Sequence, residues 1–232
     1  MKKLTFLVIS LMTSASANAQ TNSIYIDQVG DESTINLTQE GQSNKIGDTE
    51  AIRFVLEGDK QTVTVKQDGN NNVIKGSVLD AASIEYDTTV TGDNNDITYD
   101  QGASGSIAGS KKTLTITGDS NDLTFNQGTV SSATDATQTI SITGDTNTLT
   151  STINTDDVVN TKTIVGSGNV ITTVQNGLAG KNIEMFLTGS TNTISLTQKS
   201  TTNVDTIKID SIGSGSDLTI IQCNTPTVAG PC

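Results

Sequence analysis

The chain has 232 residues, of which 25 are acidic and 13 basic, and its formal net charge is −12 at pH 7. This charge repels phosphate backbones, so we expect no nucleic-acid partner. The sequence has no histidine and a single arginine, Arg53, which removes the usual general base and any paired-arginine clamp, so we expect no enzyme activity, no metal site and no cofactor.

The N-terminal segment has the features of a secretory signal peptide. Lys2 and Lys3 form a positive region, an apolar run follows at 4–12, and Ala17-Asn18-Ala19 is an A-x-A cleavage site. The apolar run is too short to span a bilayer, which argues against a membrane anchor. We predict that residues 1–19 are removed and that the chain is secreted by a bacterium, to the extracellular space or the cell surface.

Internal periodicity dominates the rest of the chain. Eight glycines mark the repeat: Gly30, Gly58, Gly92, Gly118, Gly144, Gly166, Gly189 and Gly213. An aliphatic residue stands five positions after every one of them. A glutamine stands nine positions after seven of them, Ile153 being the exception, and an asparagine stands three positions after five of them. These columns indicate one structural unit repeated about eight times.

Each unit is predicted to be a strand, a tight turn, a second strand and a return loop. Segments such as 113–117 and 122–126 alternate apolar and polar residues, which is the pattern of half-buried strands. Glycine and asparagine tolerate the positive φ of tight turns. Because a single coil cannot bury its apolar side, the coils must stack along an axis. We therefore predict an all-β fold, a β-solenoid of about eight stacked strand-turn-strand coils over residues 20–222.

Polar side chains are predicted inside this solenoid. The asparagine, aliphatic and glutamine columns share one parity, and we assign that side of the strands to the interior. Stacked amides can hydrogen-bond to the coils above and below, which satisfies buried polar groups and holds the register. The predicted ladder consists of Gln28, Gln39, Gln67, Gln101, Gln127, Gln175, Gln198 and Gln222, with Asn44, Asn72, Asn95, Asn121, Asn147, Asn169 and Asn192.

The same columns, written Q-x-G-x-x-N-x-aliphatic-x-x-x-Q, resemble the curlin repeat of bacterial curli, the functional amyloid fibres of biofilm matrices. The match is good within 22–80, where Gln28-Val29-Gly30 leads to Ile35 and Gln39, and it is looser from there to 223. The resemblance implies a subunit that polymerises with itself, head to tail, into an extracellular fibre of a biofilm matrix or for surface adhesion. It leaves outer-membrane secretion or nucleator proteins open as further partners.

The C-terminal segment 223–232 differs from the repeats, because it holds both cysteines and both prolines of the chain. Export favours oxidation, so we predict a disulfide between Cys223 and Cys232. Closing a loop of this size contributes about 2–3 kcal/mol. The loop is interpreted as a cap, as a plug that docks on the next subunit or as a stapled tail, and pairing between chains is also open.

Other functions remain open. Outward threonines such as Thr113, Thr115 and Thr117 resemble the flat threonine arrays of ice-binding solenoids, so a monomeric binding or adhesion solenoid is one alternative. A virion fibre or decoration protein is another, against which the signal peptide argues. Turn aspartates such as Asp59 are weak calcium ligands at most, since turn chemistry explains them and the nonapeptide calcium pattern is absent.

Overall fold

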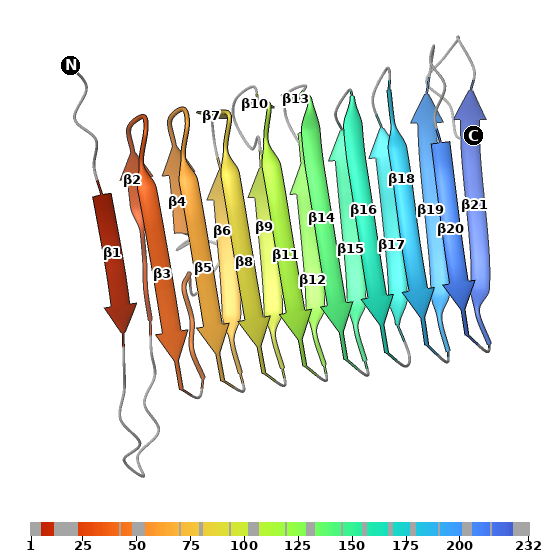
Figure 1. The fold of residues 1–232 in the computed structure, drawn as a ribbon, viewed down its shortest axis with the longest axis horizontal. Coiled ribbons are helices and arrows are strands. Elements are labelled where there is room, and N and C mark those ends of the chain that lie inside the picture. The colour runs from red at the N-terminus through yellow and green to blue at the C-terminus, as the bar shows by residue number, and fades with distance from the viewer. Residues whose placement is uncertain are drawn as a thin grey trace.

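The computed structural model describes residues 6–11, 23–41, 43–47, 54–69, 71–78, 81–92, 94–101, 107–118, 120–128, 133–144, 146–154, 157–166, 169–176, 180–189, 191–200, 206–213 and 215–224. In these ranges the chain forms β-strands and no helix, so no membrane-spanning helix occurs in them. The strands build two large parallel sheets that lie face to face along the length of the molecule (Figure 1). The predicted all-β solenoid is confirmed.

Sheet A contains nine strands among the described residues: β1 (Phe6–Leu11), β3 (Thr34–Glu40), β5 (Thr62–Asp68), β8 (Glu85–Thr91), β11 (Lys111–Thr117), β14 (Ala136–Thr143), β16 (Val158–Val165), β18 (Asn182–Thr188) and β20 (Thr206–Ile212). Sheet B also contains nine: β2 (Asp27–Val29), β4 (Phe54–Glu57), β6 (Val73–Val78), β9 (Asp96–Gln101), β12 (Asp122–Gln127), β15 (Thr148–Asn154), β17 (Val170–Asn176), β19 (Thr193–Ser200) and β21 (Asp217–Asn224). Three short strands pair in the return loops: β7 (Ala81–Ala82), β10 (Ile107–Ala108) and β13 (Ala133–Thr134).

The core lies between sheets A and B, because each strand buries every second side chain. In β11 the buried residues are Lys112, Leu114 and Ile116, and the residues between them face outward. Most buried apolar side chains of both sheets form one continuous cluster along the solenoid, and Ala136, Ile153 and Val158 form a second, small one. Period-two alternation in the sequence is therefore the direct cause of the two-layer core.

The turn glycines lie at two opposite edges rather than in one column. Gly92 connects β8 of sheet A to β9 of sheet B, and the five later glycines make the same connection. Gly30 and Gly58 make the reverse connection, from sheet B to sheet A. The prediction of about eight equivalent coils is thus wrong in its count: about six turns share the predicted register, and the first two are offset by half a coil.

A second glycine turn in the N-terminal coils explains this offset. Gly69 follows Gly58 by half a coil and connects β5 to β6, from sheet A to sheet B. The Gly69 N–H donates to the carbonyl of Thr91, the residue before Gly92, at 2.9 Å. Gly69 therefore stacks on Gly92, and the long interval from Gly58 to Gly92 covers one and a half coils.

Glycine is required at the A-to-B turn because successive turns lie too close together for a side chain. A Cβ atom on Gly144 would overlap the carbonyl group of Gly118, and one on Gly118 would overlap that of Gly92. The Gly118 N–H donates to the carbonyl of Thr143 in the next coil at 2.9 Å. This close main-chain approach holds the coils at a constant spacing.

Candidate functional site

The last coil of the solenoid leaves core positions uncovered. Leu218 and Ile220 of β21 are in register with Ile194 and Leu196 of β19. Ile194 and Leu196 are at most 1% exposed, whereas Leu218 and Ile220 are each 47% exposed. No other described strand pairs with the outer edge of β21. The C-terminal end is therefore a cross-section through the core, and its edge can accept another strand.

Sheet A ends in the same way at β20. Ile207 and Ile209 are only partly buried, although they pack against the core cluster. On the outward side of the strand, Lys208 Nζ donates to Glu184 Oε1 at 2.7 Å, and this hydrogen bond raises the pKa of Lys208. The end of the solenoid thus has an apolar interior strip, and its outward side mixes charged and polar side chains with the exposed Ile212 and Ile221.

The N-terminal end is covered at sheet A and open at sheet B. β1 pairs in parallel with β3, so that Leu7 is opposite Ile35. Among the described strands, β2 has a neighbour, β4, on one side only, although the interior side chains of Ile24 and Ile26 just before it are buried. Because β1 lies within the segment that is predicted to be removed, loss of that segment would uncover the edge of β3.

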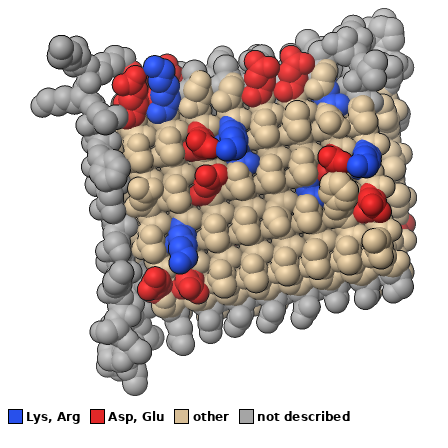
Figure 2. Space-filling view, in the orientation of Figure 1, with Lys and Arg blue, Asp and Glu red and all other residues tan. Residues whose placement is uncertain are grey.

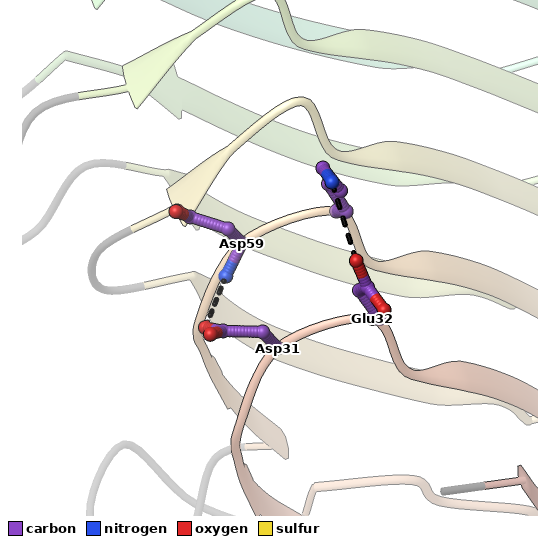
Figure 3. A network of polar contacts seen from close by, with 4 residues as sticks. Asp31, Glu32 and Asp59 are labelled. Carbon is purple, nitrogen blue, oxygen red and sulfur yellow. Dashed lines mark hydrogen bonds and ion pairs between the residues drawn. The ribbon is translucent and has the colours of Figure 1, made fainter. Parts of the chain in front are cut away.

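Polar contacts align the first two B-to-A turns (Figure 3). The Asp59 N–H donates to Asp31 Oδ1 at 3.2 Å, and Lys60 Nζ donates to Glu32 Oε1 at 3.2 Å. The Lys60 and Glu32 side chains are well exposed, so their ion pair contributes about 0–1 kcal/mol. The contacts nevertheless hold the first turn in line with the next, so it presents a regular stacking surface.

The predicted glutamines lie in two columns, one in each sheet, as the half-coil offset requires. In sheet A, Gln67 Nε2 donates to Gln39 Oε1 at 2.8 Å, which is a ladder bond between coils. In sheet B one register position is shared by Gln28, Gln101, Gln127, Gln175, Gln198 and Gln222. Buried side chains are those of Gln39, Gln67, Gln127, Gln175 and Gln198.

Three glutamines of the predicted ladder differ from these buried ones. Gln28, in the first coil, is half-buried, and Gln222, in the last, is exposed. The side chain of Gln101 lies outside the described residues. The two described exceptions stand at the two ends of the solenoid, where one neighbouring coil is lacking.

The predicted asparagines mainly close the turns. All seven are buried: Asn44, Asn72, Asn95, Asn121, Asn147, Asn169 and Asn192. Six of them donate from Nδ2 to the carbonyl of the glycine three residues earlier, at 2.8–3.3 Å. Asn95 also donates to Asn121 Oδ1 in the next coil, at 3.2 Å. The amide-to-amide ladder thus occurs at this pair, while closure of the turn is the more general role.

Three lysines lie inside the solenoid, and the sequence reasoning missed them. Lys112, Lys162 and Lys181 are each at most 2% exposed. Lys112 Nζ lies 3.6 Å from the centroid of the Tyr99 ring and 4.0 Å from that of Phe125. Burial lowers the pKa of Lys112 well below its ordinary value, and it lowers the pKa of Lys162 to about 7.

The alternation pattern contained the signal for two of these lysines. Lys112 has the parity of Leu114 and Ile116 on β11, and Lys162 has that of Ile164 on β16. Among the described residues, no three or more acidic, cysteine or histidine side chains are grouped so that they could hold a metal ion. The two ends of the solenoid suit contact between copies of the chain, because core positions and strand edges are uncovered there.

Comparison with known proteins identifies no relative of this chain. No protein-family model, curated protein or solved structure matches the chain. Cys223 ends up half-buried in β21, and Cys232 lies outside the described residues, so their pairing stays a prediction. The candidate site is accordingly defined by the geometry of the two ends.

Proposed function

We propose that this chain is a secreted structural subunit that assembles head to tail into an extracellular fibre of the curli type, in a biofilm matrix or for surface adhesion. Residues 1–19 are removed on export, which uncovers β3. The C-terminal end of one copy then stacks on the N-terminal end of the next. Outer-membrane secretion or nucleator proteins are the further partners that the curlin resemblance allows.

The observation that carries this proposal is the open last coil. Covering Leu218 and Ile220 would bury aliphatic surface, which contributes about 25 cal/mol per Å². A strand added to β21 would also satisfy its unpaired main-chain groups. The surfaces that meet are different ends of the molecule, so the contact does not close on itself and growth continues as a filament.

Assembly of the mature chain, residues 20–232, tests the proposal. Negative-stain electron microscopy over a range of concentrations should show unbranched fibres, and fibre diffraction should show a spacing near 4.8 Å along the axis. A preparation that contains only monomers at every concentration would contradict the proposal.

A pair of variants tests whether the open end drives this assembly. Ile220→Lys places a charge on the apolar strip and should leave folded monomers in solution. Thr219→Lys adds the same charge on the outward side of β21 and should still form fibres. Equal fibre yields from the two variants would show that stacking at this end is not the basis of assembly.

A second candidate function follows from the outward face of sheet A. Thr113, Thr139 and Thr161 stand in register in three successive coils, and Thr117 pairs with Thr143 beside them. On the face shown in Figure 2, charged side chains are few and rows of uncharged side chains run across it. A regular array of hydroxyl and methyl groups suits an ordered surface such as ice, bound by a monomer. Thermal hysteresis of the monomeric protein tests this function, and its absence excludes it.

A further inference from the structure

Once β1 is removed, the described solenoid begins and ends in the same sheet. Removing β1 from the nine strands of sheet A leaves eight, against nine in sheet B. The first remaining strand is β2 and the last is β21, and both belong to sheet B. The chain climbs half a coil with each strand, so this odd total of strands constrains how two copies can join.

A copy that is merely translated along the axis cannot join both sheets. Its β2 would stack on β21 of the preceding copy, one strand spacing away. Its β3 would then lie two spacings from β20, with an empty strand position between them in sheet A. Each such junction would leave a row of unpaired main-chain groups and an opening into the core, which is unfavourable.

We propose that consecutive copies in the fibre are related by a half-turn about its axis combined with the translation. This inference rests on the proposed fibre function and specifies how consecutive subunits of the fibre join. The half-turn exchanges the two sheets, so β3 of one copy stacks on β21 of the preceding copy, and β2 stacks on β20. Every strand position is then filled, and both sheets continue without a gap.

The residues at the two ends match one another in this arrangement. The half-turn places the turn at Gly30 on the turn at Gly213. Both glycines start the same repeat pattern, so residues at equal distances from them along the chain lie opposite each other. The interior positions that meet are Ile35 with Leu218, Leu37 with Ile220, Gln39 with Gln222, Ile24 with Ile207 and Ile26 with Ile209. Aliphatic residues therefore meet aliphatic residues, and the glutamine column continues through the junction.

The edge of β3 already carries a strand of this kind. β1 pairs with β3 in parallel, with Leu7 opposite Ile35 and Ile9 opposite Leu37. In the half-turn junction, Leu218 and Ile220 of the preceding copy's β21 take the register positions of Leu7 and Ile9. The strand that is lost with the leader is thus replaced by a strand with aliphatic residues at the same places.

The glycine turns support the same direction of stacking. The space for a Cβ atom on Gly58 is filled by the carbonyl of Gly30, one coil earlier. Among the described residues, a Cβ atom on Gly30 would meet only Gln28 Nε2, at 3.9 Å. In the junction, the carbonyl of Gly213 from the preceding copy fills the space beside Gly30. The close approach that spaces the turns within one copy is therefore repeated between copies.

Disulfide trapping in fibres tests the half-turn. The parent is the mature chain with Cys223→Ser and Cys232→Ser, into which pairs of outward cysteines are introduced. The half-turn places Asn36 over Thr219 and Tyr25 over Lys208, one strand spacing of about 4.8 Å apart, which a disulfide can bridge. The translated junction instead places Tyr25 over Thr219, because their strands then share the register of sheet B.

The matched variants are Asn36→Cys with Thr219→Cys, Tyr25→Cys with Lys208→Cys, and Tyr25→Cys with Thr219→Cys. Fibres are oxidised with diamide and analysed on a non-reducing denaturing gel. We expect covalent ladders from the first pair; if that variant does not assemble, we expect them from the second pair. The cross-linked fraction of the third pair should be at least tenfold lower. Ladders from the third pair, or fibres in which no pair cross-links, overturn the half-turn and leave the fibre function standing. If the parent and all variants form no fibres, the proposed function itself fails, and the junction with it.

Discussion

Lys162 is an ionisable side chain in the centre of the core, where aliphatic residues are expected. Its side chain is fully buried in β16, where it is in register with Ile140 of β14 and Met185 of β18. Its Nζ donates to Asn160 Oδ1 at 2.8 Å. Transferring an ammonium charge from water into such surroundings is costly, and burial lowers the pKa of this amine to about 7.

Replacement of this lysine should stabilise the monomer at pH 7. The ordinary pKa is 10.5, so between about pH 7 and 10.5 the unfolded chain binds more protons than the folded one. The free energy of unfolding therefore rises with pH across this window and is independent of this group below it. Lys162→Met should raise the free energy of unfolding at pH 7 by on the order of 2–4 kcal/mol and reduce its rise toward pH 10. Urea denaturation from pH 6 to pH 10 measures both effects.

The control for this experiment is Lys66→Met, which removes an exposed lysine from β5 and should change the stability by no more than about 0.5 kcal/mol. Some rise with pH should persist in Lys162→Met, because burial lowers the pKa of Lys112 in the same direction. A steeper rise with pH in Lys162→Met than in the unaltered chain would contradict the assignment.

Among the structural elements, β6 shows how neighbouring coils share space. Phe54, Gly76, Tyr99 and Phe125 occupy one interior register position in four successive coils. The Tyr99 and Phe125 ring centroids are 5.6 Å apart, and a Cβ atom on Gly76 would lie 2.9 Å from the Tyr99 ring. Glycine weakens a strand interior, so its place here is explained by the room it leaves for the rings.

This packing predicts strong coupling between Gly76 and Tyr99. Gly76→Val should destabilise the monomer by about 1–3 kcal/mol through overpacking. Tyr99→Ala should cost about 3–5 kcal/mol through the cavity it leaves. In the double variant the valine methyl groups enter that cavity, so the loss should be smaller than the sum by at least about 1 kcal/mol. A double-mutant cycle measured by urea denaturation checks this, and additive losses would show that the two residues do not share the space.

The strands of the solenoid were predictable from the sequence, but the half-coil offset was not. Alternation identifies strands, and stacking follows because one coil cannot bury its apolar side. The two edges use the same turn: Gly30 and Gly41 both have positive φ, as do Glu32 and Ser43 two residues after them. The local sequence of the turn is therefore the same at both edges. Only the long interval before Gly92 and the stacking of Gly69 on that turn distinguish the B-to-A turns from the A-to-B turns.

The open ends were harder to predict than the coils for a related reason. Leu218 follows the same column rule as Ile194, so the local sequence of a terminal coil is that of an interior coil. The difference is the lack of a neighbouring strand, which is a property of the whole stack. Lys112 and Lys162 had a local signal, their parity, but a charged residue at an apolar position is naturally interpreted as outward.

At the scale of the whole molecule, the solenoid is a two-layered slab with its strands across the long axis (Figure 1). Opposite charges in adjacent coils pair on its outward faces, as in Lys111 with Glu85 at 2.6 Å. These pairs cancel locally, and the chain keeps a net charge of −12, which would become more negative if Lys2 and Lys3 were removed with the predicted signal peptide. Two copies that approach end to end therefore repel each other over a range set by the ionic strength.

Fibre growth should accordingly accelerate with salt. The screening length falls from about 30 Å at 10 mM to about 8 Å at 150 mM ionic strength, so repulsion between approaching copies weakens across this range. The lag before thioflavin fluorescence rises should shorten several-fold between these conditions at constant protein concentration. Asp27→Asn should shorten the lag at 10 mM more than Asp122→Asn, because the half-turn places Asp27 over Asp210 while Asp122 lies in the middle of sheet B. A lag that lengthens with salt would show that attraction between charges, rather than repulsion, governs the approach of the two ends.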